Sequence, residues 1–125
     1  MKAATALLFA SVLILAAGGA FAQSSESGER TFSQQCKTCH TVEKDGKSPV
    51  GPNLFGVIGR KAATAAGYEF SDAMKKSGIT WDEASLADYL KDPKAKVPDG
   101  KMAFVGLKRP PQVADVIAYL KKVAQ

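Results

Sequence analysis

The sequence predicts a small all-α domain in which a few helices are joined by long loops. Val113, Val116, Ile117 and Leu120 follow one another at i, i+3, i+4 and i+7, the spacing of one apolar helix face. The middle of the chain is divided instead by glycine and proline, as in Gly51-Pro52, which is typical of loops rather than of sheet strands. A length of 125 residues suits one small domain and not two.

The first 22 residues have the features of a secretory signal peptide. Lys2 gives a positive start, an apolar run without charge follows, and Ala20-Phe21-Ala22 forms a small-x-small cleavage site. A retained membrane anchor is the alternative, because residues 3–22 are roughly long enough to cross a bilayer. We expect cleavage, which assigns residues 1–22 to the signal and residues 23–125 to a periplasmic domain.

Two short helices are expected in the first half of this domain. The first covers residues 29–35, with Ser27 as its cap. The second covers residues 71–77, with Ser71 as its cap and Gly78 as its stop.

The second half of the domain is expected to hold two longer helices. Thr80 and Glu83 form a capping box, and the helix that follows ends at Asp92-Pro93. Residues 94–105 read as a loop, and Pro110-Pro111 suits the start of the last helix.

The chain is moderately basic, with 17 Lys and Arg against 12 Asp and Glu and a formal net charge of +5. Secretion and the lack of a basic stripe interleaved with aromatic residues argue against nucleic acid as a partner. A modest basic excess more often steers a small protein towards acidic partners or anionic surfaces.

The two cysteines belong to the pattern Cys36-Lys37-Thr38-Cys39-His40, a C-x-x-C-H motif. This motif is typical of covalent haem attachment. Two thiols at this spacing reach the two neighbouring vinyl groups of a haem and form thioethers, while His40 can bind the iron from the same side. We therefore predict one covalently bound haem c.

Three other chemistries use similar cysteines and fit this sequence less well. A thioredoxin-like redox pair would accompany a βαβ pattern, and none is visible. A zinc site needs four protein ligands, which two cysteines and one histidine do not supply. A disulfide between Cys36 and Cys39 would not require His40.

His40 is the only histidine, so ligation of the iron by two histidines within this chain is excluded. The sixth position is then open or held by another residue, and methionine sulfur is the usual soft ligand. Met1 leaves with the signal, and Met74 lies on an expected helix as a core residue. Met102, in the loop of residues 94–105, is our candidate for the second axial ligand.

The sequence resembles the class I cytochrome c family, in particular mitochondrial cytochromes c and bacterial cytochromes c2, over about residues 28–119. The motifs that carry this resemblance are Cys36-Lys37-Thr38-Cys39-His40-Thr41-Val42-Glu43-Lys44, Gly51-Pro52-Asn53-Leu54, Gly59-Arg60-Lys61, Gly78-Ile79-Thr80-Trp81, Tyr89-Leu90 and Pro98-Asp99-Gly100-Lys101-Met102-Ala103-Phe104. The resemblance implies a small single-domain fold of helices and long loops wrapped around one haem.

The resemblance also implies roles for individual residues. His40 and Met102 would be the axial ligands, and the Pro52 carbonyl would accept a hydrogen bond from the imidazole of His40. Tyr89 would lie near the sulfur of Met102. The remaining roles implied are Trp81 and Arg60 near the inner haem propionate, Phe104 over the exposed haem edge, and Gly28, Phe32, Val116 and Tyr119 between the first and last helices.

Three positions depart from the family pattern. Phe70 stands where a tyrosine is common, and Gly100 stands where a threonine is common. Those hydroxyls often reach a propionate, so we expect altered propionate hydrogen bonding and a shifted reduction potential. Asp99 replaces a usual glycine and adds a negative charge beside Met102.

These features together indicate a single-haem electron carrier and not an enzyme. The resemblance implies a bc1-type complex as donor and an oxidase or photosynthetic reaction centre as acceptor, and a periplasmic dehydrogenase is an equally open partner. We expect a monomer that meets membranes only through partner complexes or an uncleaved signal. Lysines that can ring the haem edge and steer acidic partners are Lys37, Lys47, Lys94, Lys101 and Lys108.

Two rival hypotheses stay open at this point. In the first, Met102 dissociates and the iron binds a gas or peroxide as a sensor or catalyst. In the second, the signal is retained and the same carrier is tethered to the membrane.

Overall fold

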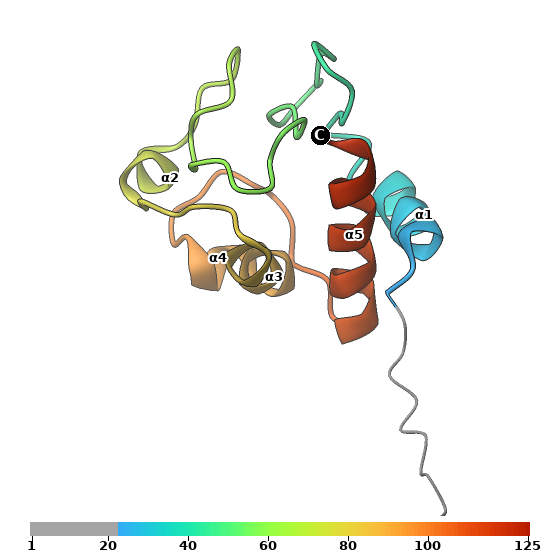
Figure 1. Ribbon diagram of the computed structural model, residues 1–125. Coiled ribbons are helices and arrows are strands. Elements are labelled where there is room, and N and C mark those ends of the chain that lie inside the picture. The colour runs from blue at the N-terminus through green and yellow to red at the C-terminus, as the bar shows by residue number, and fades with distance from the viewer. Residues whose placement is uncertain (1–22) are drawn as a thin grey trace, which may run out of the picture.

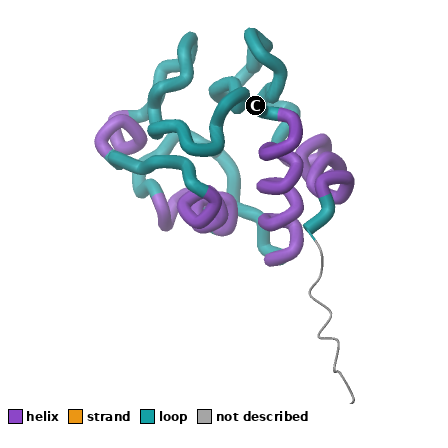
Figure 2. The backbone as a smooth tube through the Cα atoms, viewed as in Figure 1, coloured by secondary structure: helices purple, strands orange, loops and turns teal. Residues whose placement is uncertain are grey.

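The computed structural model describes residues 23–125, so the expected signal peptide lies outside the described part. Helices and loops form this part of the chain without β-strands, and one isolated antiparallel bridge joins Lys61 and Thr80 (Figures 1 and 2). The predicted all-α class is confirmed. No helix within residues 23–125 has the length and hydropathy needed to cross a membrane. The helices are α1 (Ser25–Gln35), α2 (Asp72–Lys76), α3 (Glu83–Lys91), α4 (Pro93–Lys96) and α5 (Pro110–Val123).

The first and last helices, α1 and α5, pack against each other along one side of the molecule (Figure 1). Gly28 makes this close approach possible, because a Cβ at Gly28 would lie 1.9 Å from the carbonyl oxygen of Asp115. The predicted start of α5 at Pro110 is confirmed. So is its predicted apolar face, whose members are buried: Val113, Val116, Ile117 and Leu120.

Helix α1 begins earlier than the sequence predicts. Its N-cap is Ser24, whose Oγ accepts a hydrogen bond from the backbone N–H of Ser27 at 3.1 Å, so the prediction of Ser27 as the cap is wrong. The reason is a contact distant in sequence. The Ser24 N–H donates to Oδ1 of Asp115 on α5 at 2.8 Å, which supports an additional turn at the start of α1.

The helices α2 and α3 lie where the sequence predicts them, with one correction. Ser71 caps α2 as expected, and its Oγ accepts from the N–H of Met74. The predicted Thr80 cap of α3 is wrong, because Asp82 fills that position and accepts from the N–H of Ser85 at 2.7 Å. Thr80 is held in the extended bridge to Lys61 and is therefore not free to begin a helix.

The expected loop of residues 94–105 is interrupted at its start by the short helix α4. Asp92 ends α3 and also caps α4, since its Oδ1 accepts from the N–H of Ala95 at 3.1 Å. Pro93 occupies the first turn of α4, where a missing N–H costs nothing. The same Asp92-Pro93 pair that correctly ends one helix thus starts another.

Residues 36–71 form loops that make up one end of the molecule (Figure 2). Side-chain hydrogen bonds to the backbone replace a sheet or helix as their support. The Asn53 amide donates to the carbonyl oxygens of Glu43 at 2.9 Å and Gly46 at 2.7 Å. Ser48 Oγ accepts from the N–H of Thr41 at 2.9 Å. These bonds hold the loop that follows His40 in one conformation.

The backbone is strained at an alanine in the loops. Ala63 adopts a left-handed backbone conformation with φ of +62°, which places its Cβ close to the following carbonyl. We expect Ala63→Gly to raise the free energy of unfolding by about 1 kcal/mol. Denaturant unfolding would measure it, with Ala66→Gly as the matched control, because Ala66 is an exposed neighbour without positive φ. A loss of stability in both variants would contradict the strain at Ala63.

Candidate functional site

A cavity of about 250 Å³ lies between the loops and the helices. Its walls are mostly apolar, and they come from the end of α1, the loops of residues 36–71, α3, α5 and the loop that follows α4. Every residue that the sequence predicts to surround the haem lines this cavity: Cys36, Cys39, His40, Pro52, Arg60, Trp81, Tyr89 and Met102.

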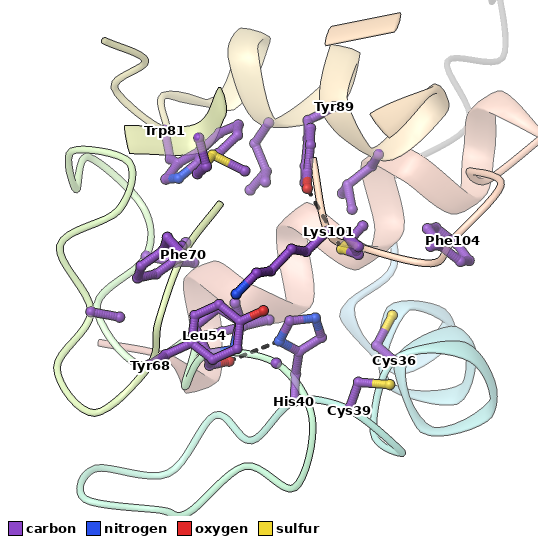
Figure 3. Close-up of a pocket in the computed structure, with 18 of the residues that line it drawn as sticks. Cys36, Cys39, His40, Leu54, Tyr68, Phe70, Trp81, Tyr89, Lys101 and Phe104 are labelled. Carbon is purple, nitrogen blue, oxygen red and sulfur yellow. Dashed lines mark hydrogen bonds between the residues drawn. The ribbon is translucent and has the colours of Figure 1, made fainter. Parts of the chain in front are cut away.

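The two cysteines lie on one side of the cavity, at the end of α1 (Figure 3). A turn joins them, because the N–H groups of Cys39 and His40 both donate to the carbonyl oxygen of Cys36 at 3.0 Å. Both are free thiols. Burial and, to a smaller extent, the neighbouring Cys39 raise the pKa of Cys36 to about 11. Cys36 is therefore protonated at neutral pH, unlike the activated thiolate of a redox enzyme.

His40 points into the cavity from the loop after Cys39 (Figure 3). Its Nδ1 lies 2.8 Å from the carbonyl oxygen of Pro52. Burial lowers the pKa of His40, and the hydrogen bond with Pro52 only partly opposes this, so the imidazole is neutral at pH 7. With its proton on Nδ1, the ring donates to Pro52 and presents an unprotonated Nε2, as a metal ligand must.

Gly51 fixes the imidazole from the other side, and sequence reasoning gave it no such role. A Cβ at Gly51 would lie 2.5 Å from Cε1 of His40. The Gly51 N–H also donates to the carbonyl oxygen of Cys39 at 2.8 Å, which ties the loop back to the motif. The dipeptide Gly51-Pro52 is a turn signal, but only the fold shows that the missing side chain makes room for His40.

Tyr89 lies across the cavity from His40 (Figure 3), and Met102 lines the cavity beside Tyr89. The Tyr89 hydroxyl donates to Sδ of Met102 across 3.8 Å. Burial, with a smaller effect of Tyr68, raises the pKa of Tyr89 to about 12, so the phenol stays protonated. The Tyr89 ring also packs on the buried Trp81, with ring centroids 4.9 Å apart. Met74 lines the same cavity from α2, in addition to packing on the core.

Arg60 is half-buried beside the cavity and is bound by its own loop. Its guanidinium donates to the carbonyl oxygens of Phe55 at 2.6 Å and Asn53 at 3.2 Å. Burial lowers the pKa of Arg60, but an arginine stays charged at any physiological pH. Arg60 thus places a permanent positive charge at the cavity wall.

Comparison with known proteins assigns the chain to a family. The Cytochrome c family model matches residues 25–124. Cytochrome c2 of Rhodomicrobium vannielii is 48% identical over 120 residues, which cover 96% of this chain and 95% of the relative. Cytochrome c2 iso-2 of Magnetospirillum fulvum is 60% identical over 88 residues, 70% of this chain and 91% of the relative. The chain belongs to the cytochrome c family.

A solved structure agrees with this membership. Cytochrome cH from Methylobacterium extorquens is 54% identical to this cytochrome and superimposes with a TM-score of 0.72. The match covers 79% of this chain and 98% of the neighbour. The class I cytochrome c fold is thereby confirmed. Like its family, this cytochrome carries electrons on one covalently attached haem c.

The cavity fits a haem on chemical grounds. Two free thiols lie on one side, the imidazole of His40 lies across the space from Tyr89 and the thioether that Tyr89 contacts, and the remaining walls are mostly apolar. Cations line the cavity at Arg60, Lys61 and Lys101, and no Asp or Glu of the described chain does so. A flat apolar macrocycle with two carboxylates would satisfy all of these groups.

The lysines expected around the haem edge are all exposed, but they differ in their contacts. Lys101 lines the cavity and donates to the carbonyl oxygen of Glu69 at 2.6 Å. Lys108 donates to the carbonyl oxygen of Val105 at 2.5 Å. Phe104 and the strongly exposed Val50 both line the cavity, and the strongly exposed Val105 follows Phe104 in the chain. These three residues, here called the apolar rim, border the cavity that Lys101 also lines.

Proposed function

We propose that this cytochrome is a periplasmic one-electron carrier, without an enzymatic reaction, whose haem is bonded to Cys36 and Cys39 and ligated by His40 and Met102. The observation that carries the proposal is the pair of axial candidates. His40 and Met102 line one cavity, and each has a partner, Pro52 for the imidazole and Tyr89 for the sulfur. Tyr89, which contacts Met102, lies across the cavity from His40 (Figure 3).

The surrounding residues support rapid electron transfer. The haem iron supplies the one-electron change between its ferric and ferrous states. Pro52 and Gly51 hold the imidazole of His40, and Tyr89 holds the thioether of Met102, so these groups move little between the two states. Buried side chains such as Trp81 and Leu90 exclude water from the cavity, which favours a high reduction potential.

The proposed partners are redox proteins with acidic docking surfaces. From the resemblance to the cytochrome c2 family, we propose a bc1-type complex as donor and an oxidase or reaction centre as acceptor, with a periplasmic dehydrogenase as the alternative donor. The apolar rim at Phe104, Val50 and Val105 suits a small and short-lived interface, and the exposed lysines suit electrostatic steering. We propose that the carrier is monomeric and that residues 1–22 direct it to the periplasm and are removed.

The test is the visible spectrum of the oxidised protein, purified from a periplasm that attaches haem. We expect the weak far-red band of methionine sulfur bonded to ferric iron, and no binding of carbon monoxide by the native reduced protein. A c-type spectrum without the band, together with carbon monoxide binding, would favour the sensor or peroxidase hypothesis. The intact mass separates a cleaved carrier from a tethered one, since retained residues 1–22 would add their full mass.

A further inference from the structure

The end of the cavity opposite the cysteines is lined by aromatic and cationic side chains, and packing of the protein alone does not require the cations there. Figure 3 shows Tyr68, Phe70 and Trp81 across the cavity from Cys36 and Cys39. Three cations line the cavity. Arg60 and Lys61 belong to the same loop region as Tyr68 and Phe70, and Lys101 lies in the loop that follows α4. Among the described residues that line the cavity there is no Asp or Glu, and the carboxylate that lies near Lys101, that of Glu69, is exposed.

The positions of the carboxylates on a haem explain why cations line this end of the cavity. The two thioether-forming groups of haem c are on one edge of the macrocycle, and its two propionate carboxylates are on the opposite edge. Attachment at Cys36 and Cys39, on which this inference rests, therefore directs the carboxylates towards the cationic end. Buried carboxylates require hydrogen-bond donors as well as positive charge. Arg60 already uses two of its five N–H groups on the carbonyl oxygens of Phe55 and Asn53. Two carboxylates can accept several hydrogen bonds, so donors beyond the rest of Arg60 and the indole N–H of Trp81 would also find acceptors there.

Tyr68 is suited to be such a donor. It lines the cavity, is half-buried, and its hydroxyl points into the space between Lys101 and His40 (Figure 3). Among the cavity residues drawn there, no hydrogen bond uses this hydroxyl. Its neighbour Phe70 has a ring of similar shape but no hydroxyl, and so cannot donate.

Two neighbouring side chains hold the Tyr68 ring in position. Its ring meets that of Phe70 edge to face, with centroids 4.8 Å apart and an angle of 82°. The Lys101 ammonium lies 5.7 Å from the Tyr68 centroid, within cation–π range. The same ammonium donates to the carbonyl oxygen of Glu69 at 2.6 Å, which connects the Met102 loop to the loop of Tyr68. A ring fixed in this way loses little entropy when its hydroxyl binds a ligand.

We propose that Tyr68 is a cofactor-positioning residue whose hydroxyl donates a hydrogen bond to a haem propionate. Lys101 and Phe70 orient its ring, and Arg60 supplies charge nearby. The bond neutralises part of a negative charge close to the iron. Removing it leaves that charge more exposed to the iron, which stabilises the ferric state and lowers the reduction potential.

The test compares Tyr68→Phe with Tyr119→Phe in the haem-loaded protein. Each change removes one hydroxyl and keeps the ring, but Tyr119 packs on Phe32 at the α1–α5 contact, away from the cavity lining. We expect Tyr68→Phe to shift the propionate bending modes in the resonance Raman spectrum and to lower the midpoint potential at pH 7. Tyr119→Phe should change neither.

Unchanged propionate modes in Tyr68→Phe would overturn the proposal, as would equal changes in both variants. The far-red band separates this inference from the proposed function. A band present in all three proteins with no effect of Tyr68→Phe rejects the propionate contact alone. Absence of the band from the unsubstituted protein rejects the axial assignment of Met102, whatever the Raman spectra show.

Discussion

Met102→Ala is expected to abolish the far-red band of the ferric protein and to lower the midpoint potential by on the order of 0.2 V. Met102 is the only methionine whose sulfur accepts a hydrogen bond from a side chain in the described structure, that of Tyr89. Without it, the iron loses a soft ligand that favours the ferrous state, and a small ligand can enter the vacated space. Visible spectroscopy, potentiometry and carbon monoxide binding by the reduced variant would measure these three effects.

Met74→Ala is the matched control for this prediction. Met74 lines the same cavity and is also partly buried, but it lies on α2 and forms no such contact with Tyr89. We expect the control to keep the far-red band, to exclude carbon monoxide and to lose stability by about 2 kcal/mol through its cavity. If Met74→Ala loses the band and Met102→Ala keeps it, the two methionines have exchanged the roles assigned here.

The helices that the sequence predicts well are those whose apolar face is set by local spacing. The buried side of α5 follows from periodicity alone. Helix starts were predicted less well, because a start depends on which N–H groups find partners elsewhere. The start of α1 depends on the hydrogen bond from the Ser24 N–H to Asp115, which is 91 residues away in the sequence. The start of α3 depends on the bridge between Thr80 and Lys61.

The site residues also divide into those that the sequence identifies locally and those that depend on the fold. Cys36, Cys39, His40 and Met102 are chemically distinctive, so a motif or a process of elimination is enough to select them. Residues that act through shape or placement were selected only where the family resemblance named them, as with Pro52 and Gly28, and Gly51 received no role. Gly51 matters because it has no side chain next to His40.

Tyr68 and Lys101 belong to this second group. The sequence alone assigned no role to Tyr68, and it placed Lys101 only among the lysines around the haem edge. Their proximity depends on how the loop before α2 meets the loop after α4, and no local pattern contains that information. The sequence does contain one usable signal. Phe70 lacks the hydroxyl that is common at that position in the family, and Tyr68, two residues earlier, carries one.

The loops of residues 36–71 depend on the cofactor for much of their packing. Residues 36–71 contain no helix and no strand, and their apolar side chains, such as Leu54, face the cavity rather than a second protein layer. A domain of this size has a limited core, and the haem supplies apolar surface that the chain does not. The side-chain bonds of Asn53 and Ser48 hold these loops at the spacing that a flat cofactor needs.

The second large effect is expected at the contact between the first and last helices. Gly28 is buried, and a Cβ there would lie 1.9 Å from the carbonyl oxygen of Asp115 and 2.9 Å from Cβ of Tyr119. Backbone cannot move aside as a flexible side chain can, so Gly28→Ala must separate α1 from α5. We expect the free energy of unfolding to fall by about 3 kcal/mol, even though alanine is the better helix former by about 1 kcal/mol.

Denaturant unfolding of the haem-loaded protein would measure this loss, with Ser33→Ala as the control. Ser33 is exposed on the same helix, so its replacement changes helix propensity without affecting the contact with α5. We expect the control to be neutral or slightly stabilised. A neutral Gly28→Ala would mean that the helices can separate at no cost. The close packing of α1 on α5 would then not be what holds the Cys36 end of α1 against the cavity.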